Sequence, residues 1–376
     1  MKKTRLLTIS YLLLFTGVFA QRSIVVSNST PLDRKAEMVE VKVEALNVDL
    51  GLKSYILKNE KGEEVAYQLV LSGKNNVQTL IFQADIKANS SSVYKLSEGE
   101  PAAVKPKTFA RFVPERKDDF AWENDLAAYR MYGPALAKEN PSNGVDLWLK
   151  RTDEVIVDKF YSDELNKGLS YHMDHGKGLD CYAVGHTLGA GGIAPYASDS
   201  LWVGNHYDSY KVLENGPLRS VFTLTYNAVK VGNEYYKQTI TITTNAGSIL
   251  NKAEVRYEGK KQKMQLAGGI ILHDSKGSLD QNAEKGIIAY AEDAVSSAKA
   301  LSGRNYVGVY TPSKKPEIIK KNNHILIISK YKPGKEFTYY FGGGWSKWGY
   351  PTDGDWFKAL RNFSESMKKP LKVKVK

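Results

Sequence analysis

Beyond Thr108, most of the chain consists of short apolar runs, rich in β-branched and aromatic residues, that are separated by polar loops. Runs of this kind favour strands, and their number and even spacing favour sheets that pack face to face. The clearest runs are 221–226, 238–244, 287–290, 307–310, 325–329 and 337–341. The sequence therefore predicts an all-β fold, with an antiparallel sandwich as the most economical architecture.

The segment from Ser23 to about Leu96 also has the pattern of strands. Val39, Val41 and Val43 alternate with charged residues, which places the three valines on one face of a strand. The segment 97–108 then breaks the pattern with two prolines, a glycine and mixed charges, as expected of a linker. We therefore predict a small β-sandwich domain over 21–105 and a larger domain over 106–376.

One helix is expected near the C-terminus. Trp356, Leu360, Phe363 and Met367 recur at helical spacing, and Asp353 stands where it can cap the first turn. This apolar stripe predicts a helix that packs on the core with one face.

The first twenty residues have the features of a secretory signal peptide. Basic residues precede an apolar run, which ends at Ala20 before Gln21. This run is too short to span a bilayer, and no later segment is long enough. We therefore expect residues 1–20 to be a signal peptide, and the protein to be exported, to the periplasm or beyond the cell.

Charge and cysteine content limit the partners and the means of stabilisation. Cys181 is the only cysteine, so no internal disulfide can form and a hydrophobic core must hold the fold. The net charge of +12 favours an anionic partner, although lysine runs also serve as solvated surface. No nucleic-acid-binding motif accompanies the lysines, so an acidic oligosaccharide fits the charge and the expected compartment better.

Several patches combine aromatic, glycine and polar residues, as sugar-binding sites do. Aromatic faces cover pyranose rings, while carboxylates, amides and guanidinium groups bind hydroxyls. The candidate substrate-binding residues in these patches are Arg116, Trp122, Asn124, Arg130, Tyr132 and Trp345.

The stretch 171-YHMDHGKGLDCYAVGHTLGAGG-192 contains three of the six histidines. His172, Asp174 and His175 have the side-chain types of a divalent metal site, but their spacing matches no established ligand pattern. His172 and His175 are equally candidates for acid–base chemistry, because histidine titrates near neutral pH. Cys181 is a candidate nucleophile, or a small buried residue. A metal cofactor therefore stays an open alternative.

A second group of candidates surrounds the segment 202–222. His206 and Tyr207 follow Asn205, and Arg219 stands after a turn at the start of a strand. In a sandwich, this position can project a guanidinium onto a concave face, where it would bind a carboxylate. The alternative is a structural arginine that pairs with Glu123 or Asp125.

Five motifs together resemble those of a family of exported proteins from polysaccharide-degrading Bacteroidota that had long been uncharacterised. The motifs are PERKDDFAWEND, YRMYGPAL, the histidine stretch, ENGPLRSVFTLTY and YYFGGGWSKWG. The resemblance implies that the larger domain is a galactose-mutarotase-like super-sandwich. It further implies an oligosaccharide dehydratase of ulvan breakdown, which acts on glucuronic acid attached to sulfated rhamnose and forms a 4,5-unsaturated uronate.

This reaction needs a group that neutralises the uronate carboxylate, a base for the C5 proton and an acid for the 4-hydroxyl. Arg219 or Arg116, with Asn124, are candidates for the first role, and a metal at His172 is an alternative. His172, His175 or His206 are candidates for the base, and Tyr207 or a second histidine for the acid. Two other functions stay open: a hydrolase or epimerase that uses Glu123 and Asp174, and a non-catalytic glycan-binding protein.

Overall fold

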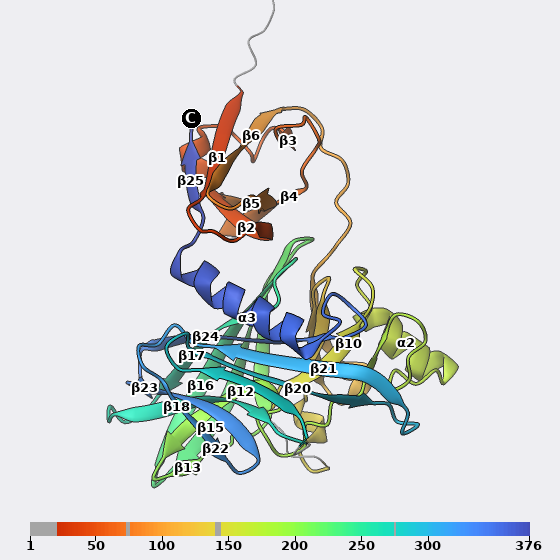
Figure 1. The fold of residues 1–376 in the computed structure, drawn as a ribbon, viewed down its shortest axis with the longest axis vertical. Helices are drawn as coiled ribbons and strands as arrows, with labels where there is room; N and C mark the ends of the chain where they lie inside the picture. The colour runs from red at the N-terminus through yellow and green to blue at the C-terminus, as the bar shows by residue number, and fades with distance from the viewer. Residues whose placement is uncertain (1–20, 73–75, 140–143, 274–275) are drawn as a thin grey trace, which may run out of the picture.

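A computed structural model describes residues 21–72, 76–139, 144–273 and 276–376 (Figure 1). The predicted signal peptide, 1–20, lies outside the described residues. Within the described ranges, none of the helices combines the length and the apolar composition that a bilayer span requires.

The N-terminal part of the chain is a small sandwich of two antiparallel sheets. Its first sheet has the order β25-β1-β6-β3, with β25 Lys372–Val375, β1 Arg22–Asn28, β6 Ser90–Glu98 and β3 Tyr55–Lys58. Its second sheet has the order β2-β5-β4, with β2 Arg34–Lys42, β5 Asn76–Ile86 and β4 Tyr67–Ser72. A short helix, α1 (Val43–Leu46), follows β2, so Val43 does not extend the predicted strand. The last strand of the chain, β25, thus pairs with the first.

An eight-stranded antiparallel sheet forms one layer of the larger part. Its order is β14-β15-β16-β17-β24-β21-β20-β19. The strands are β14 Tyr207–Asn215, β15 Arg219–Val231, β16 Glu234–Asn245, β17 Asn251–Glu258, β19 Ser278–Asn282, β20 Ile287–Val295, β21 Leu301–Tyr310 and β24 Glu336–Trp345.

Two five-stranded antiparallel sheets form the facing layer. The first has the order β11-β10-β9-β8-β7, with β7 Phe109–Val113, β8 Asp119–Glu123, β9 Ala127–Met131, β10 Asp146–Lys150 and β11 Gly178–Asp180. The second has the order β13-β12-β18-β23-β22, with β12 Ala190–Ala197, β13 Ser200–Leu201, β18 Met264–Ile271, β22 Glu317–Lys321 and β23 His324–Tyr331. Strands β9, β10 and β12 contact β24 across the sandwich. Two single-turn helices, η1 (Pro114–Arg116) and η2 (Pro134–Leu136), flank β8 and β9.

The main core lies between these two layers. Trp122, Tyr129, Phe222 and Phe341 pack ring against ring at its centre, with centroids 5.1–6.3 Å apart. Burial of such large apolar surfaces is the dominant favourable contribution to folding. The predicted all-β architecture with a closing helix is therefore confirmed.

Two longer helices cover the outer faces of the sandwich. Helix α2 (Val157–Lys167), which the sequence analysis did not predict, packs on the outer face of the β7–β11 sheet. Helix α3 (Asp353–Lys368) packs Trp356 and Leu360 against β20 and β21, and Figure 1 shows it between the small sandwich and the large sheet. Its N-cap is Thr352, not the predicted Asp353, because the hydroxyl of Thr352 accepts from the backbone of Asp355.

Candidate functional site

Arg130 lies at the centre of a buried cluster of charged groups beneath α2. Tyr129 and Met131 face the main core, so Arg130 points to the other side of the sheet. Its Nε donates to Asp146 at 2.9 Å, and its Nη2 donates to Asp180 at 2.8 Å. Burial opposes the charge of this guanidinium, but the carboxylates outweigh that effect and raise the pKa of Arg130. Because only 2% of the side chain is exposed, Arg130 orders the site instead of contacting a substrate.

Tyr132 follows Arg130 at the end of β9. Nη2 of Arg130 lies 3.4 Å from the hydroxyl of Tyr132, and both Arg130 and Arg116 lie over the face of the ring. Burial, with the negative charge of Asp146, raises the pKa of Tyr132 well above its usual value. The phenol is therefore protonated near neutral pH and carries a proton that it could donate, but its raised pKa makes it a weaker acid than an ordinary tyrosine.

Arg116, at the end of η1, is the accessible guanidinium of the cluster. Its side chain is 25% exposed, and its Nη1 lies 3.3 Å from the carboxylate of Asp119. Burial raises the pKa of Asp119 to about 6, although Arg130 and Arg116 oppose this shift. Asp119 therefore neutralises Arg116 only in part near pH 6, and Arg116 keeps the capacity to bind an external carboxylate.

His172 stands beside this cluster, on the segment after α2. Its Nδ1 lies 2.9 Å from the carbonyl oxygen of Asp180 and 3.5 Å from the carboxylate of the same residue. A carbonyl oxygen only accepts hydrogen bonds, so in the neutral ring Nδ1 carries the proton and Nε2 has the lone pair. The side chain is 41% exposed. His172 is thus oriented as a proton acceptor.

A second group of polar side chains lies on the inner face of the eight-stranded sheet. Glu292 accepts from Nδ1 of His273 at 2.7 Å, and Nε2 of His273 donates to the carbonyl of Ala183 at 2.5 Å. Burial opposes protonation of His273, but the hydrogen bond and charge of Glu292 prevail and raise its pKa. Tyr182 lies with its ring centroid 5.1 Å from that of His273, and Asn305 pairs with Glu292 across β20 and β21.

Several atoms of this second group are buried without a hydrogen-bond partner in the described part of the chain. They include the hydroxyl of Tyr182, Oε2 of Glu292 and Oδ1 of Asn305. Buried polar atoms are normally satisfied, so these are candidates for contact with water or a ligand. No local pattern in the sequence marks Glu292 and Asn305, because only the register of β20 and β21 brings these two residues together.

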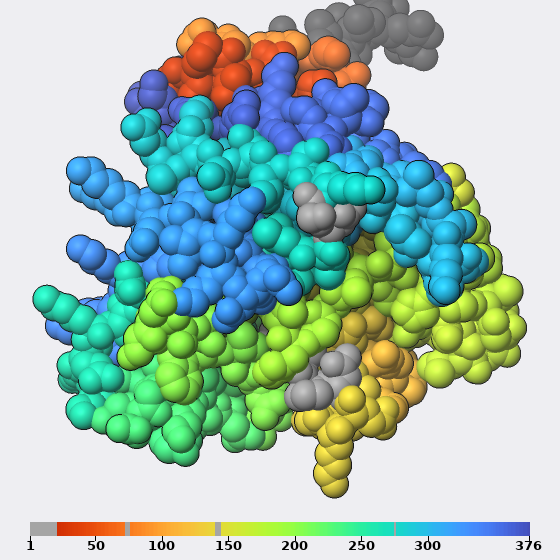
Figure 2. All heavy atoms as spheres, turned by 60° about the horizontal axis from the view of Figure 1, so that its bottom comes forward, coloured from red at the N-terminus to blue at the C-terminus, as the bar shows by residue number. Residues whose placement is uncertain are grey.

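The two groups meet at the loop between β20 and β21. The backbone amide of Ser297 lies 3.4 Å from the carbonyl oxygen of His172. Figure 2 shows this light-blue loop beside the yellow-green segment that follows α2.

Cys181 lies between the two groups, and burial raises its pKa to about 12, so its thiol is protonated and a poor nucleophile.

Several predicted site residues have structural partners instead. Trp122 and Trp345 are 0% and 1% exposed, so neither ring can cover a sugar in this structure. Asn124 donates to the carbonyls of Asn245 and Ser248, and thereby fixes the turn after β16. These residues build the core that supports the site.

The group around β14 and β15 is likewise separate from the cluster. Arg219 is 9% exposed and binds Glu214 at 2.9 Å and Glu40 of the small sandwich at 2.8 Å. Its guanidinium is thus occupied at the junction between domains. It pairs neither with Glu123, which binds Lys150, nor with Asp125.

Tyr207 and His206 are also buried. The hydroxyl of Tyr207 donates to the carbonyl of Asp118, and burial raises its pKa well above the usual value. Nδ1 of His206 lies 3.4 Å from Oδ1 of Asn205. Tyr207 therefore supports the backbone next to Asp119, and its proton is already donated within the protein.

The proposed metal ligands point to separate partners. His172 turns to Asp180, Asp174 to Arg151 at 3.1 Å, and Nε2 of His175 to the carbonyl of Ser170 at 3.0 Å. Among the described residues, no three or more His, Cys, Asp and Glu side chains are grouped so that they could hold a metal ion. The divalent-metal alternative thus has no donor set in this part of the chain.

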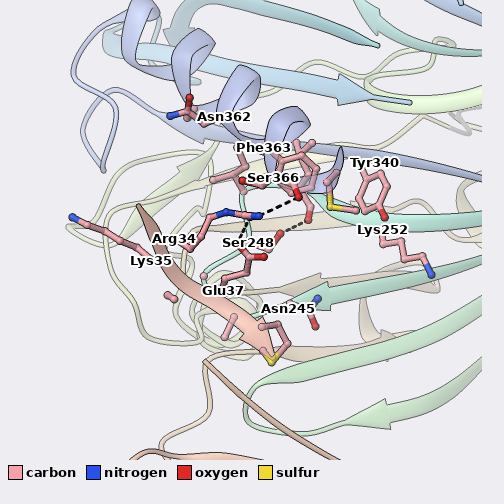
Figure 3. A pocket seen from close by; sticks show the side chains of 18 of the residues that line it. Arg34, Lys35, Glu37, Asn245, Ser248, Lys252, Tyr340, Asn362, Phe363 and Ser366 are labelled. Atoms are coloured by element: carbon pink, nitrogen blue, oxygen red, sulfur yellow. Dashed lines mark hydrogen bonds and ion pairs between the residues drawn. The ribbon is translucent and has the colours of Figure 1, made fainter. Parts of the chain in front are cut away.

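A cavity of about 530 Å³ lies at the junction between the small sandwich and the large sheet. It is lined by β2, the turn between β16 and β17, and α3 (Figure 3). Arg34 crosses it from β2 and donates to Glu37 and to the carbonyls of Ser366 and Lys369. None of the predicted site residues lines this cavity, and Arg34 joins the two domains there.

Comparisons with known proteins agree with this architecture. A solved structure of a protein in the Glycosyl Hydrolase Family 38 from Enterococcus faecalis matches with a TM-score of 0.54 and 9% identity. The match covers 95% of this chain and 47% of that one, so the chain spans about half of its length. At this identity, the likeness concerns the fold alone.

Sequence comparison gives the family. Uncharacterized protein P7 of Formosa agariphila is 29% identical, over 94% of this chain and 93% of its own length. The model of a family described as a domain of unknown function, DUF4861, matches residues 26–373. The chain therefore belongs to the DUF4861 family.

Proposed function

We propose that the protein is an exported, carbohydrate-active lyase. In this proposal it removes water from the non-reducing-end glucuronic acid of ulvan-type oligosaccharides and leaves a 4,5-unsaturated uronate. The observation that carries the proposal is the juxtaposition of an oriented, accessible imidazole with a guanidinium-rich cluster: Nδ1 of His172 is held by Asp180, which also binds Arg130. The sandwich fold shared with a glycoside hydrolase family member and the positive net charge are consistent with an anionic sugar substrate.

The chemistry assigns one role to each group. Arg116 binds the uronate carboxylate, which lowers the cost of the negative charge that develops when C5 loses its proton. Nε2 of His172 accepts that proton, and the electrons of the C5–H bond form the C4–C5 double bond. The C4–O bond breaks as Tyr132 protonates the departing hydroxyl, and water leaves. Arg130 and Arg116, over the ring of Tyr132, stabilise the transient phenolate. The proton then returns from His172 to Tyr132 through solvent.

The alternative functions have weaker support. Glu123, one member of the carboxylate pair of a hydrolase or epimerase, is fully buried, binds Lys150 and accepts from the first amides of α2. Asp174, the other member, binds Arg151. Trp122 and Trp345, the two tryptophans predicted to cover a sugar ring, are buried and cannot do so in a glycan-binding protein.

The test uses saturated oligosaccharides that end in glucuronate on sulfated rhamnose, followed by mass and ultraviolet absorbance. A dehydratase removes one water for each chain and creates a conjugated double bond without shortening the chain. Release of smaller sugars would overturn the proposal in favour of a hydrolase. Sugar that binds but is recovered unchanged would favour a binding protein.

A further inference from the structure

The outward face of the β25-β1-β6-β3 sheet carries an excess of lysines. Along β1 and β6, Ile24, Val26, Tyr94 and Leu96 point into the small sandwich and are buried. The residues that alternate with these along each strand therefore point outward, to the opposite face of the sheet. The outward lysines, all exposed, are Lys58, Lys95, Lys372, Lys374 and Lys376, and we call this surface the lysine face.

The register of the strands places three of these lysines in one row. Lys58 lies directly opposite Lys95, and Lys95 lies opposite Ser23. Ser23 exchanges two backbone hydrogen bonds with Lys376, at 3.1 and 2.8 Å. Because neighbouring strands are about 4.8 Å apart, the row crosses the whole sheet. Lys374 and Lys372 continue along β25, in steps of about 7 Å. Figure 1 shows β25 at the edge of this sheet, beside β1.

This arrangement is unfavourable without a partner. Like charges directly opposite each other destabilise a sheet, as Lys58 and Lys95 do here. In the described part of the chain, none of the lysines of the face forms an ion pair. Two carboxylates lie beside the face: Glu64 stands opposite Lys58 in an isolated bridge and accepts from the amide of Ala102, and Glu60 accepts from the amide of Val93. They offset part of the positive charge near Lys58, and the face keeps an excess of lysines.

Protection of a sheet edge explains only part of the pattern. Lysines on an edge strand discourage pairing with other chains, and this accounts for Lys372, Lys374 and Lys376 on β25 and for Lys58 on β3, the other edge strand. It does not account for Lys95, because β6 lies between β1 and β3. Between the lysines, the face offers the hydroxyls of Ser27 and Ser91, which lie 2.7 Å apart.

We propose that the lysine face binds an extended anionic polysaccharide and holds the polymer near the catalytic domain. A flat sheet with cations spread over four strands suits a long, regularly charged chain better than a compact anion. The choice of a glycan as the polyanion rests on the proposed function. Binding to two parts of one protein raises the local concentration of chain ends at the site around His172.

The experiment compares two triple variants of the full chain with equal loss of charge. K58S/K95S/K376S removes the row, and K314S/K320S/K332S removes exposed lysines of the larger domain. Retention is measured on an immobilised sulfated, uronic-acid-containing polysaccharide, with a neutral polysaccharide as reference. We expect the row variant to bind about tenfold more weakly, and the control to bind like the wild type. Binding of the wild type weakens as salt increases.

Equal affinities of the two variants, or equal binding of the wild type to the neutral polysaccharide, would overturn the proposal. Tighter binding to duplex DNA or to anionic lipid vesicles would also overturn it, in favour of another polyanion. Turnover of a short oligosaccharide, measured in parallel, distinguishes a failure of the lysine-face proposal from a failure of the proposed dehydratase activity. Loss of polymer binding with unchanged turnover supports the lysine face, whereas polymer binding without any turnover rejects only the dehydratase. Thermal unfolding verifies that both variants are folded.

Discussion

The imidazole of His172 and the backbone carbonyl of Asp180 lie 2.9 Å apart, while the carboxylate of Asp180 binds Arg130. One buried residue therefore holds the candidate base with its backbone and the central guanidinium with its side chain. Burial and the proximity of Asp146 raise the pKa of Asp180, and Arg130 opposes this shift. The position of His172 is thus tied to the charge balance of the whole cluster.

Replacement of His172 by alanine should reduce kcat for water elimination by about 10²–10⁴-fold, because the proton acceptor at C5 is lost. The rate is measured from the ultraviolet absorbance of the unsaturated uronate. His175→Ala is the matched control, since His175 is exposed and its Nε2 contacts the backbone carbonyl of Ser170, away from the cluster around Arg130. Full activity of the His172 variant would remove this residue from the mechanism.

The Tyr132→Phe variant tests the proton donor. It keeps the ring beneath Arg116 and Arg130 but removes the hydroxyl, so we expect kcat to fall by about 10²-fold with little change in KM. Tyr207→Phe is the comparison, because its hydroxyl donates to the backbone of Asp118. A larger loss of kcat in the Tyr207 variant than in the Tyr132 variant would reverse this assignment.

Local patterns in the sequence were sufficient to predict the fold class and the strands named above. The run 221–226 lies in β15 and 337–341 lies in β24, since alternation and β-branched residues act over a few neighbours. Helix α2 escaped prediction because its first amides are capped by Glu123, which lies more than thirty residues earlier, on β8. The pairing of β25 with β1 has no local signal either.

The candidate site was predictable only in part, for a similar reason. Aromatic residues in polar motifs serve sugar binding and core packing equally, so Trp122 and Trp345 could not be assigned to the core from sequence. Glu292 and Asn305 stand in separate strands without a motif, and only the register places them opposite each other. Arg219 was recognised as special, but its partner Glu40 belongs to the other domain.

Arg219 should matter for stability and not for turnover. Arg219→Met removes its ion pairs with Glu214 and Glu40 and leaves the partly buried Glu214 without a cation. We expect the free energy of unfolding to fall by about 2–3 kcal/mol, with kcat unchanged. Glu40→Gln should cost less than about 1 kcal/mol, because Glu40 is 58% exposed. Urea unfolding and turnover are measured on the same samples, and a loss of kcat without loss of stability would restore a catalytic role for Arg219.

The raised pKa of Asp119 predicts how stability depends on pH. The folded protein binds this proton with a pKa of about 6, against a usual value of 3.8, so the contribution of the Asp119 side chain to stability is fully present below about pH 4 and is lost as the pH rises to about 6. The Asp119→Asn variant has no ionisable group at this position, so its stability does not decline for this reason. Relative to the wild type, the variant should therefore gain on the order of 3 kcal/mol between pH 4 and pH 6.5. The measurement is urea unfolding of both proteins across this range.

Asp33→Asn is the control for this prediction. Hydrogen bonds to Lys87 and Ala88 lower the pKa of Asp33, so this group titrates below the window in which Asp119 changes charge. Its difference from the wild type should stay constant from pH 4 to pH 6.5. A constant difference for Asp119→Asn as well would mean that Asp119 ionises as an ordinary carboxylate. Asp119 would then neutralise Arg116 fully at pH 6, and Arg116 would lose the partial freedom on which its role in binding the substrate carboxylate depends.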